Sequence, residues 1–259
     1  MRRYLIVLFL GLGEGLRPPL PPAHIRGLVR PWSSSTAAET AESTRTQKRD
    51  ELLDAVRLLD RGFTATAEDR KRITSMLLNL ADLNPTANPG AAYFDPELLT
   101  TDDLLADAEL LKGRWTLVYT DAPDITSLND NPVSEVGRIG QECDSTARTI
   151  KNIIQWRPRS WLRLGPLAED EVEQRVVLKA KSTPGAPKKV DLFVEGLDLS
   201  PKALLGQAWT GEDFELRGPL SGQIPFGTFN VLFLDDVLRV VRTAQGYFAV
   251  NVRDNDGAW

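Results

Sequence analysis

The sequence predicts a mainly β fold with N-terminal helices, in which a helical hairpin precedes an antiparallel barrel or sandwich. Apolar residues first recur at helical spacing, between residues 47 and 83. From Trp115 onward, short runs rich in β-branched and aromatic residues alternate with turn residues. Roughly seven or eight such runs at short spacing are typical of closed or stacked antiparallel sheets.

The chain is expected to have four parts. Residues 1–46 are predicted to be a targeting segment with a disordered tail, and residues 47–103 a helical hairpin with a linker. Residues 104–254 are predicted to form the β domain, and residues 255–259 a short tail. At 259 residues, the chain has room for one sizeable domain with such extensions.

The first residues have the pattern of a targeting signal. A basic start, Met1-Arg2-Arg3, precedes a run of apolar residues at positions 4–10, as in a secretory signal peptide. Residues 26–36 are rich in Arg and Ser and lack acids, as plastid transit peptides do. A signal followed by a transit-like segment suits a secondary plastid, which is surrounded by extra membranes. The alternative is a disordered tail with an apolar run that arose by chance.

The charge distribution argues against nucleic acid as a partner. Residues 1–36 hold five of the 31 basic residues and one of the 36 acidic residues. Without them, 26 basic and 35 acidic residues remain, and the net charge goes from −5 to −9. Nucleic-acid binding needs a basic surface, and an acidic body is not drawn to an anionic bilayer by charge alone. Membrane contact would have to be apolar or mediated by a partner.

Two helices are predicted before the β region. The first carries Leu52, Leu53, Val56 and Leu59 on one face, and Arg61-Gly62 ends it, because glycine readily adopts the left-handed conformation beyond a helix. The second shares one apolar face among Ile73, Met76, Leu77 and Leu80. These stripes are expected to face the protein core.

The segment from Gly113 to Thr120 is predicted to be the first strand. Its alternation places Trp115, Leu117 and Tyr119 on one face. Further strands are expected at 137–144, 149–156, 172–180, 190–194, 229–234, 237–242 and 247–252. Residues 121–133, with two prolines, are expected to form an exposed loop.

The sequence offers little catalytic chemistry. Its single histidine, His24, lies in the segment expected to be removed, so histidine-based catalytic and metal sites are excluded from the mature chain. No glycine-rich phosphate loop is present, and Cys143 is the single cysteine. Asp235-Asp236 is either a carboxylate pair for acid–base or metal chemistry or, as we favour, a turn between strands. We therefore expect no enzyme, no cofactor and no metal.

Several segments together resemble the fibrillin family of plastid lipid-associated proteins. The resemblance spans about residues 47–254 and rests on Arg61-Gly62, Asn84-Pro85, the strand entered through Leu111-Lys112-Gly113-Arg114-Trp115, and the C-terminal stretches 233–242 and 246–250. It implies a lipocalin-like antiparallel β-barrel preceded by a helical hairpin. In such barrels an Arg near the last strand stacks on the Gly-x-Trp of the first. The corresponding residues here are Gly113, Trp115 and either Arg239 or Arg242.

The resemblance also implies a function without catalysis. The protein would bind or carry apolar isoprenoid lipids, such as a prenylquinone, a tocopherol or a carotenoid, at plastoglobules or thylakoids. The alternative is a structural coat for lipid droplets, or a scaffold for an isoprenoid-quinone synthesis enzyme, with no cargo of its own. Trp156 and Trp161 either form an apolar lip at the barrel mouth or pack at its edge. The residues expected to line the barrel interior are Leu117, Tyr119, Val176, Leu178, Phe248 and Val250.

Overall fold

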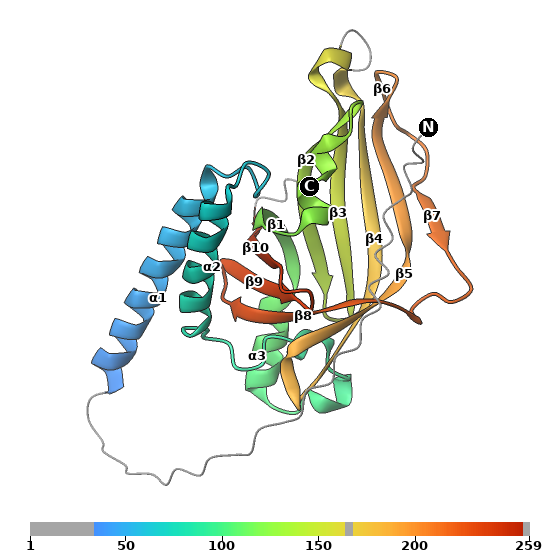
Figure 1. The fold of residues 1–259 in the computed structure, drawn as a ribbon. Helices are drawn as coiled ribbons and strands as arrows, with labels where there is room; N and C mark the ends of the chain where they lie inside the picture. The colour runs from blue at the N-terminus through green and yellow to red at the C-terminus, as the bar shows by residue number, and fades with distance from the viewer. Residues whose placement is uncertain (1–33, 164–167, 256–259) are drawn as a thin grey trace.

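A curved β-sheet with a helical hairpin on its outside makes up most of this computed structural model, which describes residues 34–163 and 168–255 (Figure 1). The helices are α1 (Ser34–Arg57), α2 (Ala67–Ala81), α3 (Asp102–Leu111) and α4 (Pro123–Thr126), with short 3₁₀ turns η1 (Ala91–Tyr93), η2 (Pro96–Leu98), η3 (Leu128–Asp130) and η4 (Ser160–Leu162). The strands are β1 (Gly113–Thr120), β2 (Ser134–Asp144), β3 (Thr149–Pro158), β4 (Glu171–Thr183), β5 (Ala186–Leu204), β6 (Gln207–Ala208), β7 (Phe214–Arg217), β8 (Ile224–Leu234), β9 (Leu238–Thr243) and β10 (Phe248–Arg253).

Eight of the strands in the described part of the chain close into an antiparallel barrel. Their order is β4-β3-β2-β1-β10-β9-β8-β5, and pairing between β4 and β5 completes the ring. The predicted fold class, a mainly β barrel with N-terminal helices, is therefore confirmed. Strands β2 to β5 rise beyond the ring as a tall curved sheet, and β7 pairs with the upper part of β5 (Figure 1).

The predicted helical hairpin lies outside the barrel against β1, β9 and β10 (Figure 1). Its apolar stripes include Leu52, Ile73 and Leu77, each fully buried against the strands. Thr66 and Asp69 form a capping box that fixes the start of α2. Helix α1 begins at Ser34, within the segment expected to be a targeting tail, while residues 1–33 lie outside the described residues.

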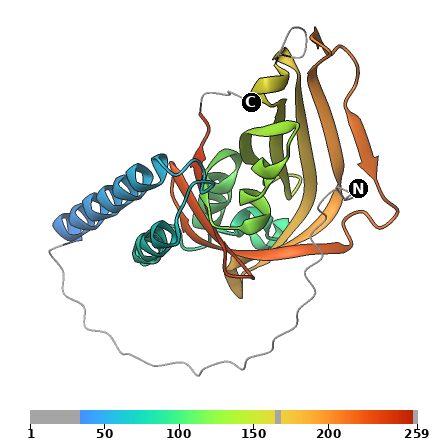
Figure 2. The ribbon, with the colours of Figure 1, turned by 45° about the horizontal axis from the view of Figure 1, so that its top comes forward.

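Two segments expected to lack regular structure carry short helices. Within the predicted linker, η1 and η2 lie ahead of α3, and η1 and α3 pack into one end of the barrel. The predicted loop at 121–133 forms α4 and η3, whose Ile125 and Leu128 pack on the opposite end of the interior. Seen with the top brought forward, the strands curve around short helices at the centre (Figure 2). Short apolar insertions of this kind carry too little periodicity to be found in a sequence.

Candidate functional site

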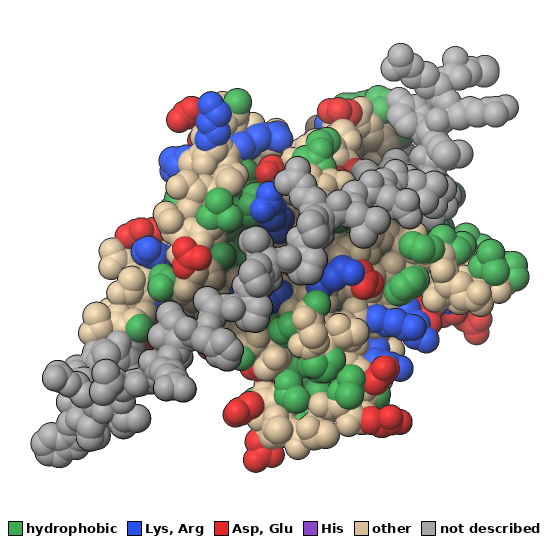
Figure 3. All heavy atoms as spheres, turned by 60° about the horizontal axis from the view of Figure 1, so that its bottom comes forward, with side chains coloured by type: hydrophobic (Ala, Val, Ile, Leu, Met, Phe, Trp, Pro, Cys, Tyr) green, Lys and Arg blue, Asp and Glu red, His purple; other side chains and the backbone are tan. Residues whose placement is uncertain are grey.

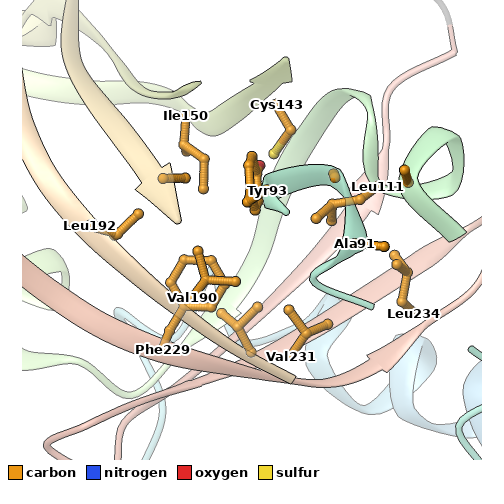
Figure 4. Close-up of a cluster of buried hydrophobic side chains, with 14 of the residues drawn as sticks. Ala91, Tyr93, Leu111, Cys143, Ile150, Val190, Leu192, Phe229, Val231 and Leu234 are labelled. Atoms are coloured by element: carbon orange, nitrogen blue, oxygen red, sulfur yellow. The ribbon is translucent and has the colours of Figure 1, made fainter. Parts of the chain in front are cut away.

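The barrel end next to α3 is filled by side chains. Tyr93 and Phe94, which η1 delivers, are almost fully buried there. In Figure 4, Ile150 and Cys143 lie above Tyr93, and Val190, Phe229 and Val231 lie below it. Burial raises the pKa of the Tyr93 hydroxyl well above its usual range, so this group stays neutral. This half of the barrel is a packed core.

Trp115 forms the floor of that core. The indole is fully buried, and its Nε1–H donates a 2.9 Å hydrogen bond to the Leu111 carbonyl at the end of α3. Two guanidinium groups lie over its ring, with Arg239 at 5.2 Å and Arg253 at 4.3 Å from the centroid. Of the two arginines considered from the sequence, Arg239 is thus the one placed on the indole.

The other predicted closure residues occupy different positions. Arg242 lies over the ring of Phe248 at 5.2 Å, away from Trp115. Gly113 opens β1 with a φ of +115°, and a β-carbon there would lie 3.1 Å from the Arg253 guanidinium. Arg253 is not predicted from the sequence, although it lies directly opposite Trp115 in the β1–β10 register.

Arg239 is a buried cation held by neutral groups. Only 1% of the residue is exposed, and its guanidinium donates to Cys143 Sγ at 3.0 Å and to the Gln141 side-chain oxygen. Among the described residues no carboxylate pairs with it, and its Nε has no hydrogen-bond partner. A buried charge without a counterion costs stability unless neighbouring dipoles and π-faces offset it, as Trp115 and Gln141 do here.

The six residues predicted to line the interior fall into three groups. Leu178 lies in the packed core, and the partly buried Val176 packs against it. Leu117 belongs to a separate cluster with Val136 and Ile139 under α4. Three others, Tyr119, Phe248 and Val250, pack on the outside against α1 and α2, so their expected interior position is wrong.

A bulge in β1 explains that difference. The β1–β10 register shifts between Leu117 and Tyr119, so that Val118 is an extra residue. One inserted residue moves all later side chains to the other face of a strand. Tyr119 then lies opposite Val250 on the outer face, whereas Leu117 lies opposite Asn251.

The tall part of the sheet leaves a set of inward-pointing apolar side chains in contact with solvent. In-register partners share a face, and the β4–β5 register places Val194 beside the core residue Leu178. Along the next strands the same face continues through the pairs Leu197–Leu216, Leu199–Phe214 and Val194–Ile224. We call this set the open apolar face: Val176, Val194, Leu197, Leu199, Phe214, Leu216 and Ile224.

The exposure of this face is greatest on β7 and at the start of β8. Phe214 is 53% exposed, Leu216 59% and Ile224 38%. Neighbouring large apolar side chains left in water are uncommon in monomeric proteins and mark contact sites. The period-two pattern Phe214-Glu215-Leu216-Arg217 is a signal from which β7 can be predicted, although none of the expected strands lies between residues 194 and 229.

Polar contacts hold β7 in place from its other side. Asp198 is buried on the outer face of β5 and accepts a 2.5 Å hydrogen bond from Arg217. The hydroxyl of Ser200 donates to Asp213 at 2.6 Å, and this bond lowers the pKa of the Asp213 carboxyl. The charged side of β7 is thereby anchored, while its apolar side faces inward and remains largely exposed, with the Trp209 ring 5.8 Å from that of Phe214. Figure 3 shows the molecule with its bottom brought forward, where charged side chains of both signs lie around separate hydrophobic patches.

The two tryptophans considered as a lip behave differently. Trp156 is partly buried in the cluster under α4, and its Nε1–H donates a 3.1 Å hydrogen bond to Gln174. Trp161, in η4, is 60% exposed. Trp156 is thus placed as edge packing, and Trp161 remains available to meet an apolar surface.

Asp235 and Asp236 form the turn between β8 and β9. The Oδ1 atom of Asp235 accepts backbone hydrogen bonds from Val237 and Leu238, and its Oδ2 atom pairs with Arg49 of α1 at 3.0 Å. These contacts give Asp235 a structural role in the turn. Within residues 34–163 and 168–255, no group of three or more acidic, Cys or His side chains is arranged to hold a metal ion. In the same ranges, no helix has both the length and the apolar character to cross a membrane.

Comparison with known proteins identifies the relatives of this fold. The family model PAP_fibrillin matches residues 46–251. The chain belongs to the PAP_fibrillin family. A comparison with solved structures finds no match.

Among curated proteins, several plastid lipid-associated proteins from plants are similar. Plastid lipid-associated protein 2, chloroplastic, of Brassica campestris is 30% identical over 170 residues, which cover 64% of this chain and 45% of the relative. Plastid lipid-associated protein 1, chloroplastic, of the same plant is 26% identical over 244 residues, covering 84% and 70%. The Citrus unshiu plastid-lipid-associated protein is 31% identical over 155 residues, covering 58% and 40%. The chain spans about half the length of the first relatives it matches. Their chloroplast location supports a plastid location for this chain.

Proposed function

We propose that this protein is a non-enzymatic plastid protein that binds or carries an apolar isoprenoid-type lipid on the open apolar face. The observation that carries the proposal is the exposure of Phe214, Leu216 and Ile224 on the inward side of the tall sheet. Family membership and the names of the relatives support a lipid-associated role. Prenylquinones, tocopherols and carotenoids have the chemistry that this face would accept, and plastoglobules or thylakoids are the places where they would be met.

Burial of the face provides the driving force. A prenyl chain lying on these side chains would remove apolar surface from water, which is favourable by about 25 cal/mol per Å². The face continues into the packed core through Val176 and Val194, so a chain could extend from the rim to the filled end of the barrel. The filled end would then limit how deeply the lipid enters.

The test is lipid binding by variants of the face. The purified full chain is mixed with a prenylquinone, and bound lipid is measured by mass spectrometry after gel filtration and by quenching of tryptophan fluorescence. Leu216→Ser is expected to weaken binding roughly three- to tenfold, because one exposed apolar contact is lost. Leu58→Ser is the matched control, since Leu58 is 86% exposed on the helical hairpin. No bound lipid, or equal binding by both variants, would contradict the proposal.

A second candidate is a structural coat or scaffold with no cargo. The packing of Tyr93 and Phe94 in the barrel favours this second function, because the half of the interior that they fill leaves no room for an isoprenoid lipid. A coat would float with lipid droplets, or co-purify with an isoprenoid-quinone synthesis enzyme, and yet take up no lipid in solution. Flotation and the binding assay together separate the two functions.

A further inference from the structure

A groove of about 670 Å³ lies on the outer side of the sheet, where β2 leaves β1. The β1–β2 ladder is regular from Gly113 to Thr116, and beyond that point the turn after α1 takes the place of β2. The Arg61 carbonyl accepts a 3.0 Å hydrogen bond from the Thr120 amide there. The groove is lined by Arg61, Thr116, Leu117, Gly137, Arg138, Ile139, Gln155, Arg157, Glu171 and Lys202.

The groove is basic although the chain is acidic. Four of its lining residues are Arg or Lys and one is acidic, in a chain of net charge −5. Three of these cations have carboxylate partners: Arg157 pairs with Glu171 at 2.7 Å, Arg61 with Asp60 at 3.0 Å and Arg138 with Asp254 at 3.7 Å. Lys202 is exposed and forms no salt bridge with any described residue, although its charge lies near enough to Asp213 to help lower the pKa of that carboxyl. Cations gathered in a concave surface raise the local concentration of anions.

Gly137 leaves room at the base of the groove. Gly137 lies between Gln155 and Arg157, and a β-carbon on it would sit 3.3 Å from Gln155 Cβ and 3.6 Å from Arg157 Nε. The absence of that carbon keeps the approach to the Arg157 guanidinium open. Leu117 and Ile139, which belong to the apolar cluster under α4, also line the groove. Because 7% of Leu117 and 6% of Ile139 are exposed, the groove offers a ligand mainly its charged and polar groups.

We propose that this groove binds an oxyanion, phosphate or sulfonate, with Lys202 and Arg157 as the direct contacts and Arg138 at the rim. The ligand is either the head group of an anionic lipid or a small free anion. The site lies on the outer side of the barrel wall, so it is separate from the open apolar face and does not depend on the function proposed for that face.

The experiment uses the full chain, inorganic phosphate, and phosphatidylcholine vesicles with and without phosphatidylglycerol. Lys202→Glu reverses the charge of an exposed cation in the groove and is expected to weaken anion binding roughly tenfold. Lys188→Glu is the matched control, because it makes the same charge change at an exposed position near the opposite end of β5. Binding by the unchanged protein is expected to fall with added salt. Far-UV circular dichroism confirms that both variants are folded.

The two ligand sources give different results. The groove is a lipid head-group site if phosphate raises the melting temperature and vesicles with phosphatidylglycerol bind the protein. Of the two variants, Lys202→Glu alone should then lose both effects. If phosphate binds but the vesicles do not, the groove takes a free anion. Equal binding by the two variants, or no binding of either probe, would overturn the proposal. Prenylquinone uptake by Lys202→Glu is expected to be unchanged, which keeps this test distinct from that of the open apolar face.

Discussion

Tyr119 shows how one extra residue decides which side of a barrel wall a side chain occupies. Alternation from Trp115 predicts an interior position for Tyr119, and the alternation holds as far as Leu117. The bulge at Val118 then turns Tyr119 toward the helices. A bulge leaves no mark in this segment, since every residue in it suits a strand, so the sequence alone could not reveal the change of face.

The Tyr119 hydroxyl makes the protein sensitive to alkali. Burial raises the pKa of this group to about 12, and among the described residues it has no hydrogen-bond partner. Below pH ~10 the hydroxyl is protonated in both folded and unfolded chains, so its contribution to stability is fully present. Between pH ~10 and the folded-state pKa, the unfolded chain releases the proton first, and the free energy of unfolding falls as the pH rises.

Tyr119→Phe is therefore expected to reduce this alkaline loss. At neutral pH the variant should lie within ~1 kcal/mol of the unchanged protein, because no hydrogen bond is removed. At high pH it should retain about 1–2 kcal/mol more of its neutral-pH stability than the unchanged protein does. Urea unfolding followed by tryptophan fluorescence across this pH range measures the difference. Tyr247→Phe, at a partly exposed position, is the control. Parallel pH profiles for Tyr119→Phe and the unchanged protein would contradict the explanation.

At the scale of elements, the turn between α1 and α2 is the joint that holds the helical hairpin on the barrel. Arg61-Gly62 predicts this turn from the sequence. The docking of the turn on β1 cannot be predicted in the same way, because it depends on contacts between distant segments. Gly62 has a φ of +96°, and a β-carbon there would lie 1.9 Å from the Thr120 carbonyl oxygen. Glycine is required both for the conformation and for the close approach.

Gly62→Ala is expected to destabilise the fold by about 2–4 kcal/mol, because the turn must move away from β1 or remain strained. Gly185→Ala is the matched control, since a β-carbon in that β4–β5 turn would meet nothing within 4 Å. The control should stay within ~0.5 kcal/mol of the unchanged protein. Denaturant unfolding of the three proteins measures both values. A neutral Gly62→Ala would show that the hairpin does not need this contact.

The elements that the sequence predicts well are those with strong local periodicity. The two long helices and the strands of the closed ring have regular spacing, and the structure contains them. Helix α3, the 3₁₀ turn η1 that carries Tyr93, and strand β7 are short, and their positions are set by tertiary contacts. As a result, the filled end of the barrel and the greater part of the open apolar face appear only in the structure.

At the scale of the whole molecule, the two ends of the barrel should differ in local stability. The end near α3 is packed, with Trp115, Leu178 and Val190 fully buried. At the other end, every residue of β6 and β7 is exposed. Local opening costs least where few apolar contacts are buried.

Hydrogen exchange is therefore expected to divide the molecule. Amides of β1, β9 and β10 should exchange slowly, near the rate set by global unfolding, whereas those of β6 and β7 should exchange quickly. Addition of a prenylquinone should slow exchange in β7 and in the paired part of β5, because a lipid on the open apolar face would bury Leu216 and Leu197, which lie opposite each other. Helix α1 is the internal control and should not change. A cargo-free coat would show no change on lipid addition, and protection of β7 equal to that of β10 before lipid is added would mean that this face is already closed.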